Sequence, residues 1–149
     1  MKHCIALLVW LLATNCFAKN FNDRDCNDVS KVEKASFVLF NKTKLVEFGE
    51  CLGVSLIKQN DTSWIPEACA EIPEDENAPL GILNLSKKEA IQIGMCLGLV
   101  EYIYHKYHDE YSGYNRLQCL DGTRAINKLL TMSNDDIASL ANIRDQLCH

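Results

Sequence analysis

The chain lacks the features that mark several large classes of protein. Its 149 residues contain no run of basic residues, and the formal net charge is −5 at pH 7. An acidic chain without a basic run is a poor binder of nucleic acid and of anionic membranes, because their phosphates repel it. Beyond residue 18 no apolar stretch approaches the ~20 residues that cross a bilayer, so we expect no membrane span.

Catalytic and cofactor motifs are also missing. The sequence has no Gly-x-Ser-x-Gly elbow, no His-Glu-x-x-His zinc motif, no glycine-rich phosphate loop and no calcium loop. On a continuous helix His105, His108 and Asp109 would share a face and could hold a divalent metal. The alternative is a solvated helix end, where basic side chains meet the negative end of the dipole. We favour the alternative and expect no catalytic residue, no metal, no cofactor and no enzyme.

What the sequence does contain is a hydrophobic leader and a set of cysteines. Residues 1–18 start with Met-Lys-His, continue as an apolar run and end in Cys16-Phe17-Ala18, which resembles a cleavage site. We therefore expect a signal peptide over 1–18, followed by one secreted, extracellular domain over 19–149. An even number of cysteines in an oxidising compartment predicts disulfide bonds but leaves their connectivity open. The six mature cysteines are Cys26, Cys51, Cys69, Cys96, Cys119 and Cys148.

Apolar residues recur three and four positions apart almost everywhere, which indicates helices, and strict alternation is hard to find. The fold class we expect is all-α: a single disulfide-stapled bundle of about six helices. Ser86 and Glu89 form a capping box that opens a mostly apolar, central helix. Residues 71–79, with two prolines and four acids, read as a loop. The expected helices cover 25–40, 43–58, a short segment from 63–66 through Cys69, 86–107, one starting at Asp121 or Thr123, and a last one capped by Ser133 and Asp136.

One short motif occurs twice. Gly49-Glu50-Cys51-Leu52-Gly53 matches Gly94-Met95-Cys96-Leu97-Gly98 at four of five positions. Glycines inside a helix are unfavourable by roughly 1 kcal/mol each relative to alanine, so a compensating contact is expected. Glycines four apart share a helix face and let another backbone approach closely. The motif therefore predicts close helix packing, and either a duplicated helical hairpin or coincidence explains its repetition.

Five tyrosines surround the end of the central helix. Tyrosine combines an apolar ring with a hydroxyl group and is enriched at binding hot spots. The alternative is that three of them belong to the core, and the periodicity places Tyr107 and Tyr111 inward. The five are Tyr102, Tyr104, Tyr107, Tyr111 and Tyr114.

Three N-x-S/T sequons predict a glycoprotein. They begin at Asn41, Asn60 and Asn84, each at an expected helix boundary where a glycan can lie on the surface. Asn84 is the weakest of the three, because Ser86 is also needed as a helix cap.

The leader, the size, the six cysteines, the two Gly-x-Cys-Leu-Gly helices and the acidic helical character resemble a known group of proteins. These are the small salivary proteins of blood-feeding mosquitoes, of the neutrophil-stimulating factor type. The insect odorant-binding and D7 salivary proteins are a more distant comparison, because their second and third cysteines lie close together whereas Cys51 and Cys69 do not. The resemblance implies a salivary protein that is delivered into a host at feeding and acts on immune cells.

Together these observations favour a secreted, non-enzymatic effector that acts by protein–protein contact and modulates host immune cells or haemostasis. Its partner would be a host or extracellular protein, such as a leukocyte receptor. The alternative is a carrier that holds a small apolar ligand between its helices, as odorant-binding proteins do.

Overall fold

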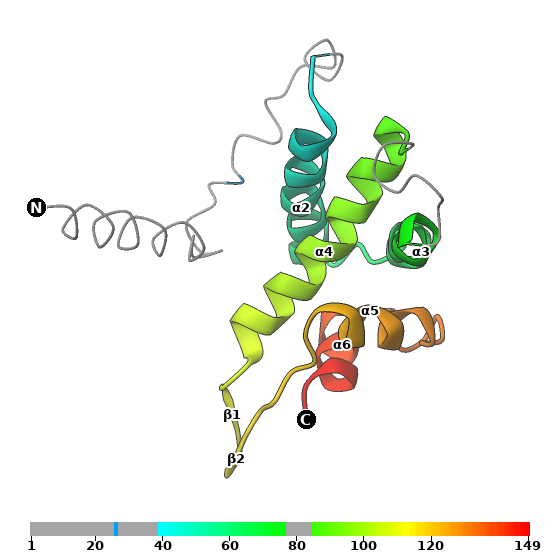
Figure 1. The fold of residues 1–149 in the computed structure, drawn as a ribbon. Helices are drawn as coiled ribbons and strands as arrows, with labels where there is room; N and C mark the ends of the chain where they lie inside the picture. The colour runs from blue at the N-terminus through cyan, green and yellow to red at the C-terminus, as the bar shows by residue number, and fades with distance from the viewer. Residues whose placement is uncertain (1–25, 27–38, 77–84) are drawn as a thin grey trace, which may run out of the picture.

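Five helices and one small β-hairpin form the part of the chain that this computed structural model describes, namely Cys26, residues 39–76 and residues 85–149 (Figure 1). In chain order the elements are α2 (Lys42–Lys58), α3 (Ile65–Glu76), α4 (Lys87–Tyr107), β1 (Tyr111–Ser112), β2 (Asn115–Arg116), α5 (Gly122–Leu130) and α6 (Leu140–Leu147). The expected helix over 25–40 lies almost entirely outside the described residues. The helical character is confirmed, whereas the antiparallel pair β1–β2 corrects the expectation of an all-α fold. No helix among the described residues is both long and apolar enough to cross a membrane.

Helix α4 is the centre of the fold, as its apolar sequence predicted. It packs against α2 on one side and against α3 and α5 on the other (Figure 1). Leu99 and Ile103 are completely buried in it, whereas Leu97 is only partly buried. The other large, fully buried side chains of the core come from the surrounding elements and are Leu45, Ile57, Ile65, Ile143 and Leu147.

The starts of α2 and α4 are fixed by side-chain caps. Ser86 Oγ accepts a hydrogen bond from the Glu89 N–H, and a Glu89 carboxylate oxygen accepts one from the Ser86 N–H at 2.6 Å. This is the expected capping box, which satisfies two backbone donors that the first turn leaves free. Asn41 Oδ1 accepts from the Lys44 N–H at 2.9 Å and starts α2 in the same manner.

Backbone contact between α2 and α4 explains the four mid-helix glycines. A Cβ atom on Gly49 would overlap the carbonyl oxygen of Ile91, and one on Gly94 would overlap the carbonyl oxygen of Val46. The second pair repeats this arrangement, with Gly53 against Met95 and Gly98 against Glu50. Any side chain at these positions would therefore separate the helices, and the predicted close packing is confirmed.

The glycine contacts are reciprocal. Each glycine faces the carbonyl three residues before its counterpart in the other helix, so the two helices run in the same direction and are related by an approximate two-fold axis. Cys51 and Cys96, which occupy equivalent positions in the motif, bond to cysteines 25 and 27 residues earlier. This second correspondence does not follow from the glycine packing, and it supports the hypothesis of a duplicated unit.

All six cysteines beyond residue 18 are paired, which confirms the predicted disulfide bonds. The pairs are Cys26–Cys51, Cys69–Cys96 and Cys119–Cys148. Among these six, the first bonds to the second, the third to the fourth and the fifth to the sixth in chain order. Cys69 and Cys96 are completely buried and join α3 to α4. The last bridge ties the C-terminus to the segment before α5, where Gln118 and His149 also exchange backbone hydrogen bonds of 2.9 and 3.2 Å.

The expected loop over 71–79 is wrong over its first six residues, because α3 continues through Pro73 to Glu76. Proline inside a helix removes a backbone hydrogen bond and normally ends the helix. Here Ile72 packs against the core and the Cys69–Cys96 bridge holds the preceding turn against α4. Tertiary contacts therefore override the local signal.

The last helix is shorter than its cap signal predicted. Ser133 and Asp136 do bond to each other, with Asp136 Oδ2 accepting from the Ser133 N–H at 3.0 Å, but they close a turn. Helix α6 instead starts after Ser139, whose Oγ accepts from the Asn142 N–H. The side chain of Asn60 contributes a second cap, since its Oδ1 accepts from the Leu140 N–H at 3.3 Å. A residue 80 positions away in the sequence thus helps to decide where this helix begins.

Candidate functional site

The end of α4 and the hairpin that follows it carry all five tyrosines of the chain. They separate into two groups. Tyr102, Tyr104 and Tyr107 are partly buried and pack against the core, whereas Tyr111 and Tyr114 lie on the hairpin. The expectation that Tyr111 points inward is wrong, because the chain leaves the helix at His108 and the helical periodicity stops there.

The hairpin forms because the chain turns back at Gly113. Ser112 pairs with Asn115, and the two-residue turn between them begins with Gly113 at φ +66°, as a type II′ turn requires. At the base of the hairpin, the Asp109 N–H donates to the Leu117 carbonyl at 3.0 Å and the Leu117 N–H donates to the Glu110 carbonyl at 2.7 Å. The sequence showed only that Ser112-Gly113 interrupts a helix. The same glycine could have suggested a two-residue turn.

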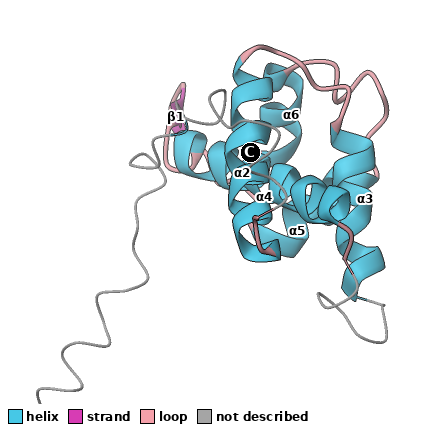
Figure 2. Cartoon of the chain, turned by 90° about the horizontal axis from the view of Figure 1, so that it is seen from above, coloured by secondary structure: helices cyan, strands magenta, loops and turns pink. Residues whose placement is uncertain are grey.

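The hairpin presents two aromatic side chains to solvent. Tyr114 is fully exposed and Tyr111 is 75% exposed. The hairpin projects away from the helices in both views (Figures 1 and 2). Exposed aromatic rings on a projecting element have no role in the core, so they are the best candidates for contact with another molecule.

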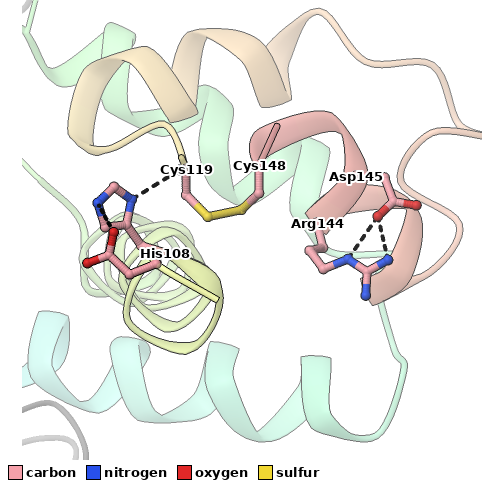
Figure 3. The surroundings of a disulfide bond; sticks show 6 residues. His108, Cys119, Arg144, Asp145 and Cys148 are labelled. Carbon is pink, nitrogen blue, oxygen red and sulfur yellow. Dashed lines mark hydrogen bonds and ion pairs between the residues drawn. A yellow bond between two sulfur atoms is a disulfide. The ribbon is translucent and has the colours of Figure 1, made fainter. Parts of the chain in front are cut away.

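A chain of polar contacts anchors the hairpin to the last disulfide. His108 Nδ1 accepts a hydrogen bond from the Cys119 N–H at 3.1 Å, directly beside the Cys119–Cys148 bridge (Figure 3). His108 Nε2 lies 3.4 Å from Asp109 Oδ1, and Asp109 Oδ2 forms an ion pair with Arg116 of β2 at 2.8 Å. The Tyr104 ring stacks on the imidazole at 4.3 Å between centroids. These contacts fix the hairpin relative to α4.

The same contacts correct the interpretation of His105, His108 and Asp109 as one helix face. Asp109 lies beyond the helix with φ +71°, so the three side chains do not share a face. The lone pair of His108 Nδ1 is already used to accept the Cys119 N–H. Among the residues that the structure describes, no three histidine, cysteine or carboxylate side chains are grouped so that they could hold a metal.

The two histidines should therefore differ in their contribution to stability. His105 is exposed, but His108 satisfies a partly buried backbone donor. We expect His108→Ala to lower the free energy of unfolding by about 1–3 kcal/mol, because the Cys119 N–H loses its acceptor. His105→Ala, the matched control, should lose only a few tenths of a kcal/mol through the helix dipole.

Urea unfolding followed by circular dichroism measures both losses of stability, and equal losses would show that the hydrogen bond to Cys119 is unimportant. His108→Asn should restore part of the loss, since its amide oxygen can replace Nδ1.

Cations lie over two of the three partly buried tyrosines of α4, Tyr102 and Tyr107. Lys58 Nζ and Lys106 Nζ lie 5.5 and 5.2 Å from the centroid of the Tyr102 ring. Lys106 Nζ also lies 5.0 Å from the centroid of the Tyr107 ring. The guanidinium group of Arg144, in α6, lies 5.7 Å from the same centroid. The pKa of Lys106 is raised above its usual value, mainly by a hydrogen bond with the Tyr102 hydroxyl group and to a smaller extent by one with the Tyr107 hydroxyl group. Three helices thus converge on two aromatic rings.

Two of the three sequons lie in the described part of the chain, at opposite ends of α2. Asn41 caps the start of the helix and Asn60 follows its end, and both side chains are exposed. Each uses Oδ1 as an acceptor, so the contacts do not involve Nδ2, the atom to which a glycan is attached. Glycosylation of Asn41 and Asn60 stays a prediction, and Asn84 lies outside the described residues.

Comparison with known proteins gives no relative from which a function could be transferred. No family model matches the chain, and neither a curated protein nor a solved structure matches it.

Proposed function

We propose that this protein is a secreted, non-enzymatic effector that acts by protein–protein contact, with the hairpin β1–β2 as its contact element. The observation that carries the proposal is the exposure of Tyr111 and Tyr114 on a projecting hairpin. Tyrosine offers a large contact area at a low cost in conformational entropy, which is why it is frequent at interface hot spots. The anchoring through Asp109, Arg116 and His108 holds the hairpin ready for binding, so little ordering is required.

The disulfide bonds support the extracellular part of this proposal. Three bridges are consistent with an extracellular protein, because thiols stay reduced in the cytosol. Delivery in saliva, and a host partner such as a leukocyte receptor or a protein of haemostasis, follow from the resemblance to mosquito salivary proteins. We retain them as the biological setting of the proposal.

A carrier of small apolar ligands would need a cavity between helices. Helices α2 and α4 touch through their backbones at four glycines, so this pair offers such a ligand no room. A carrier would therefore need its cavity between another pair of helices.

A double substitution tests the hairpin. Tyr111→Ala with Tyr114→Ala should weaken binding of the labelled protein to vertebrate leukocytes or plasma proteins by at least tenfold, because hot-spot side chains contribute about 2 kcal/mol or more. Flow cytometry and pull-down from plasma provide the measurement. The control is Leu39→Ala with Leu130→Ala, which removes the other two exposed large apolar side chains of the described residues. Equal losses in the two variants, or full binding without the tyrosines, would contradict the proposal.

A further inference from the structure

Two lysines from different helices share one aromatic ring. Lys58 is the last residue of α2 and Lys106 lies in the last turn of α4, yet both ammonium groups are within 5.5 Å of the centroid of Tyr102. Each contact is a favourable cation–π interaction. Bringing two positive charges to one ring, however, costs electrostatic energy that a bound anion would recover.

The protein itself does not supply that anion among the residues that the structure describes. Neither Lys58 nor Lys106 forms an ion pair there, and Glu101, which precedes Tyr102, pairs with neither of them. In contrast, the described arginines are each paired with a carboxylate: Arg116 with Asp109, Arg124 with Asp121 and Arg144 with Asp145. In a chain with five more acidic than basic residues, carboxylates are plentiful. Lys44 and Lys128 also lack a carboxylate partner among the described residues, so what distinguishes Lys58 and Lys106 is that they lack one while sharing a ring.

The hydroxyl group of Tyr102 adds a neutral hydrogen-bond donor to the two ammonium groups of Lys58 and Lys106. Its oxygen accepts a hydrogen bond from Lys106 Nζ at 3.0 Å, so its own proton remains to be donated. Lys58 and Lys106 are exposed and Tyr102 is partly exposed, so all three side chains are open to an incoming group. Two ammonium groups and a hydroxyl proton form a donor set suited to carboxylates.

We propose that Lys58, Lys106 and Tyr102 bind a short acidic segment of the partner protein. This inference rests on the proposed function, and it names the chemistry of the partner. In an extended peptide, carboxylates two residues apart lie on one face about 7 Å from each other, close enough to engage two cations around one ring. A long sulfated polysaccharide fits less well, because the net charge of −5 would repel it beyond the site itself.

Binding of a short fluorescein-labelled oligoglutamate peptide tests this site. Fluorescence anisotropy at low ionic strength should show binding that salt weakens, because the ion pairs are exposed. Lys58→Ala with Lys106→Ala should weaken binding about tenfold, the combined effect of two exposed ion pairs. Lys44→Ala with Lys87→Ala changes the net charge equally at exposed lysines elsewhere, and should change binding by less than about twofold.

The outcomes separate this inference from the proposed function. Tyr111→Ala with Tyr114→Ala should leave oligoglutamate binding intact, so failure of the peptide to bind would overturn the acidic-segment site alone. Equal weakening in the two lysine variants would overturn it too, because the effect would then be one of overall charge. A heparin fragment that binds more tightly than oligoglutamate, and loses binding in the Lys58/Lys106 variant, would assign the site to a polysaccharide instead.

Discussion

Alanine in place of Gly94, or of its counterpart Gly49, should lower the free energy of unfolding by about 2–3 kcal/mol. In an ordinary helix interior the same substitution stabilises by about 1 kcal/mol, because alanine has the better helix propensity. The expected sign is reversed here, because the new methyl group would meet the backbone of the other helix rather than a side chain that can move. The helices would have to separate, and contacts would be lost along their whole interface.

Chemical denaturation with the disulfides intact measures this effect. Glu47→Ala in α2 and Glu101→Ala in α4 are the controls, since both residues are exposed in the same two helices. They should change stability by less than about 0.5 kcal/mol. An increase in stability on Gly94→Ala would mean that α2 and α4 are not in backbone contact, and the approximate two-fold arrangement would then lose its basis.

Removal of the bridge between α3 and α4 is expected to have the largest effect of all. Cys69→Ala with Cys96→Ala should cost about 3.5 kcal/mol in chain entropy, and about 1–2 kcal/mol more because both sulfur atoms are completely buried. Cys26→Ala with Cys51→Ala is the matched control. Its sequence separation of 25 residues is close to the 27 of the first pair, so its entropic contribution is nearly the same.

The difference between the two double variants therefore reports the deeper burial of Cys69 and Cys96, since Cys26 and Cys51 are only partly buried. Urea unfolding gives both values, and mass spectrometry checks that the other two disulfides remain formed. If the Cys26–Cys51 variant lost as much stability as the Cys69–Cys96 variant, the buried position of the second bridge would contribute nothing beyond loop closure.

The sequence by itself determined where α4 begins and that α2 and α4 each pack closely against another backbone. The Ser86/Glu89 capping box joins residues three apart, and the two glycines of each motif lie four apart on one helix face, so both signals can be read from local spacing. It also predicted that the six cysteines beyond residue 18 would be paired, because an even number of cysteines in an oxidising compartment favours disulfide bonds. The sequence did not determine which cysteine bonds to which.

Only the tertiary structure decided the features that depend on residues far apart in the chain. Helix α3 continues through Pro73 because the core holds it, and α6 starts at Leu140 with the help of Asn60. The same applies to the candidate sites. Tyr111 lies on the hairpin rather than on α4, which ends with its cap residue His108, where the imidazole accepts the Cys119 N–H. Lys58 meets Lys106 over Tyr102 because α2 and α4 lie in backbone contact and run in the same direction. Local propensity carries no information about these long-range contacts, since they form only when the whole chain folds.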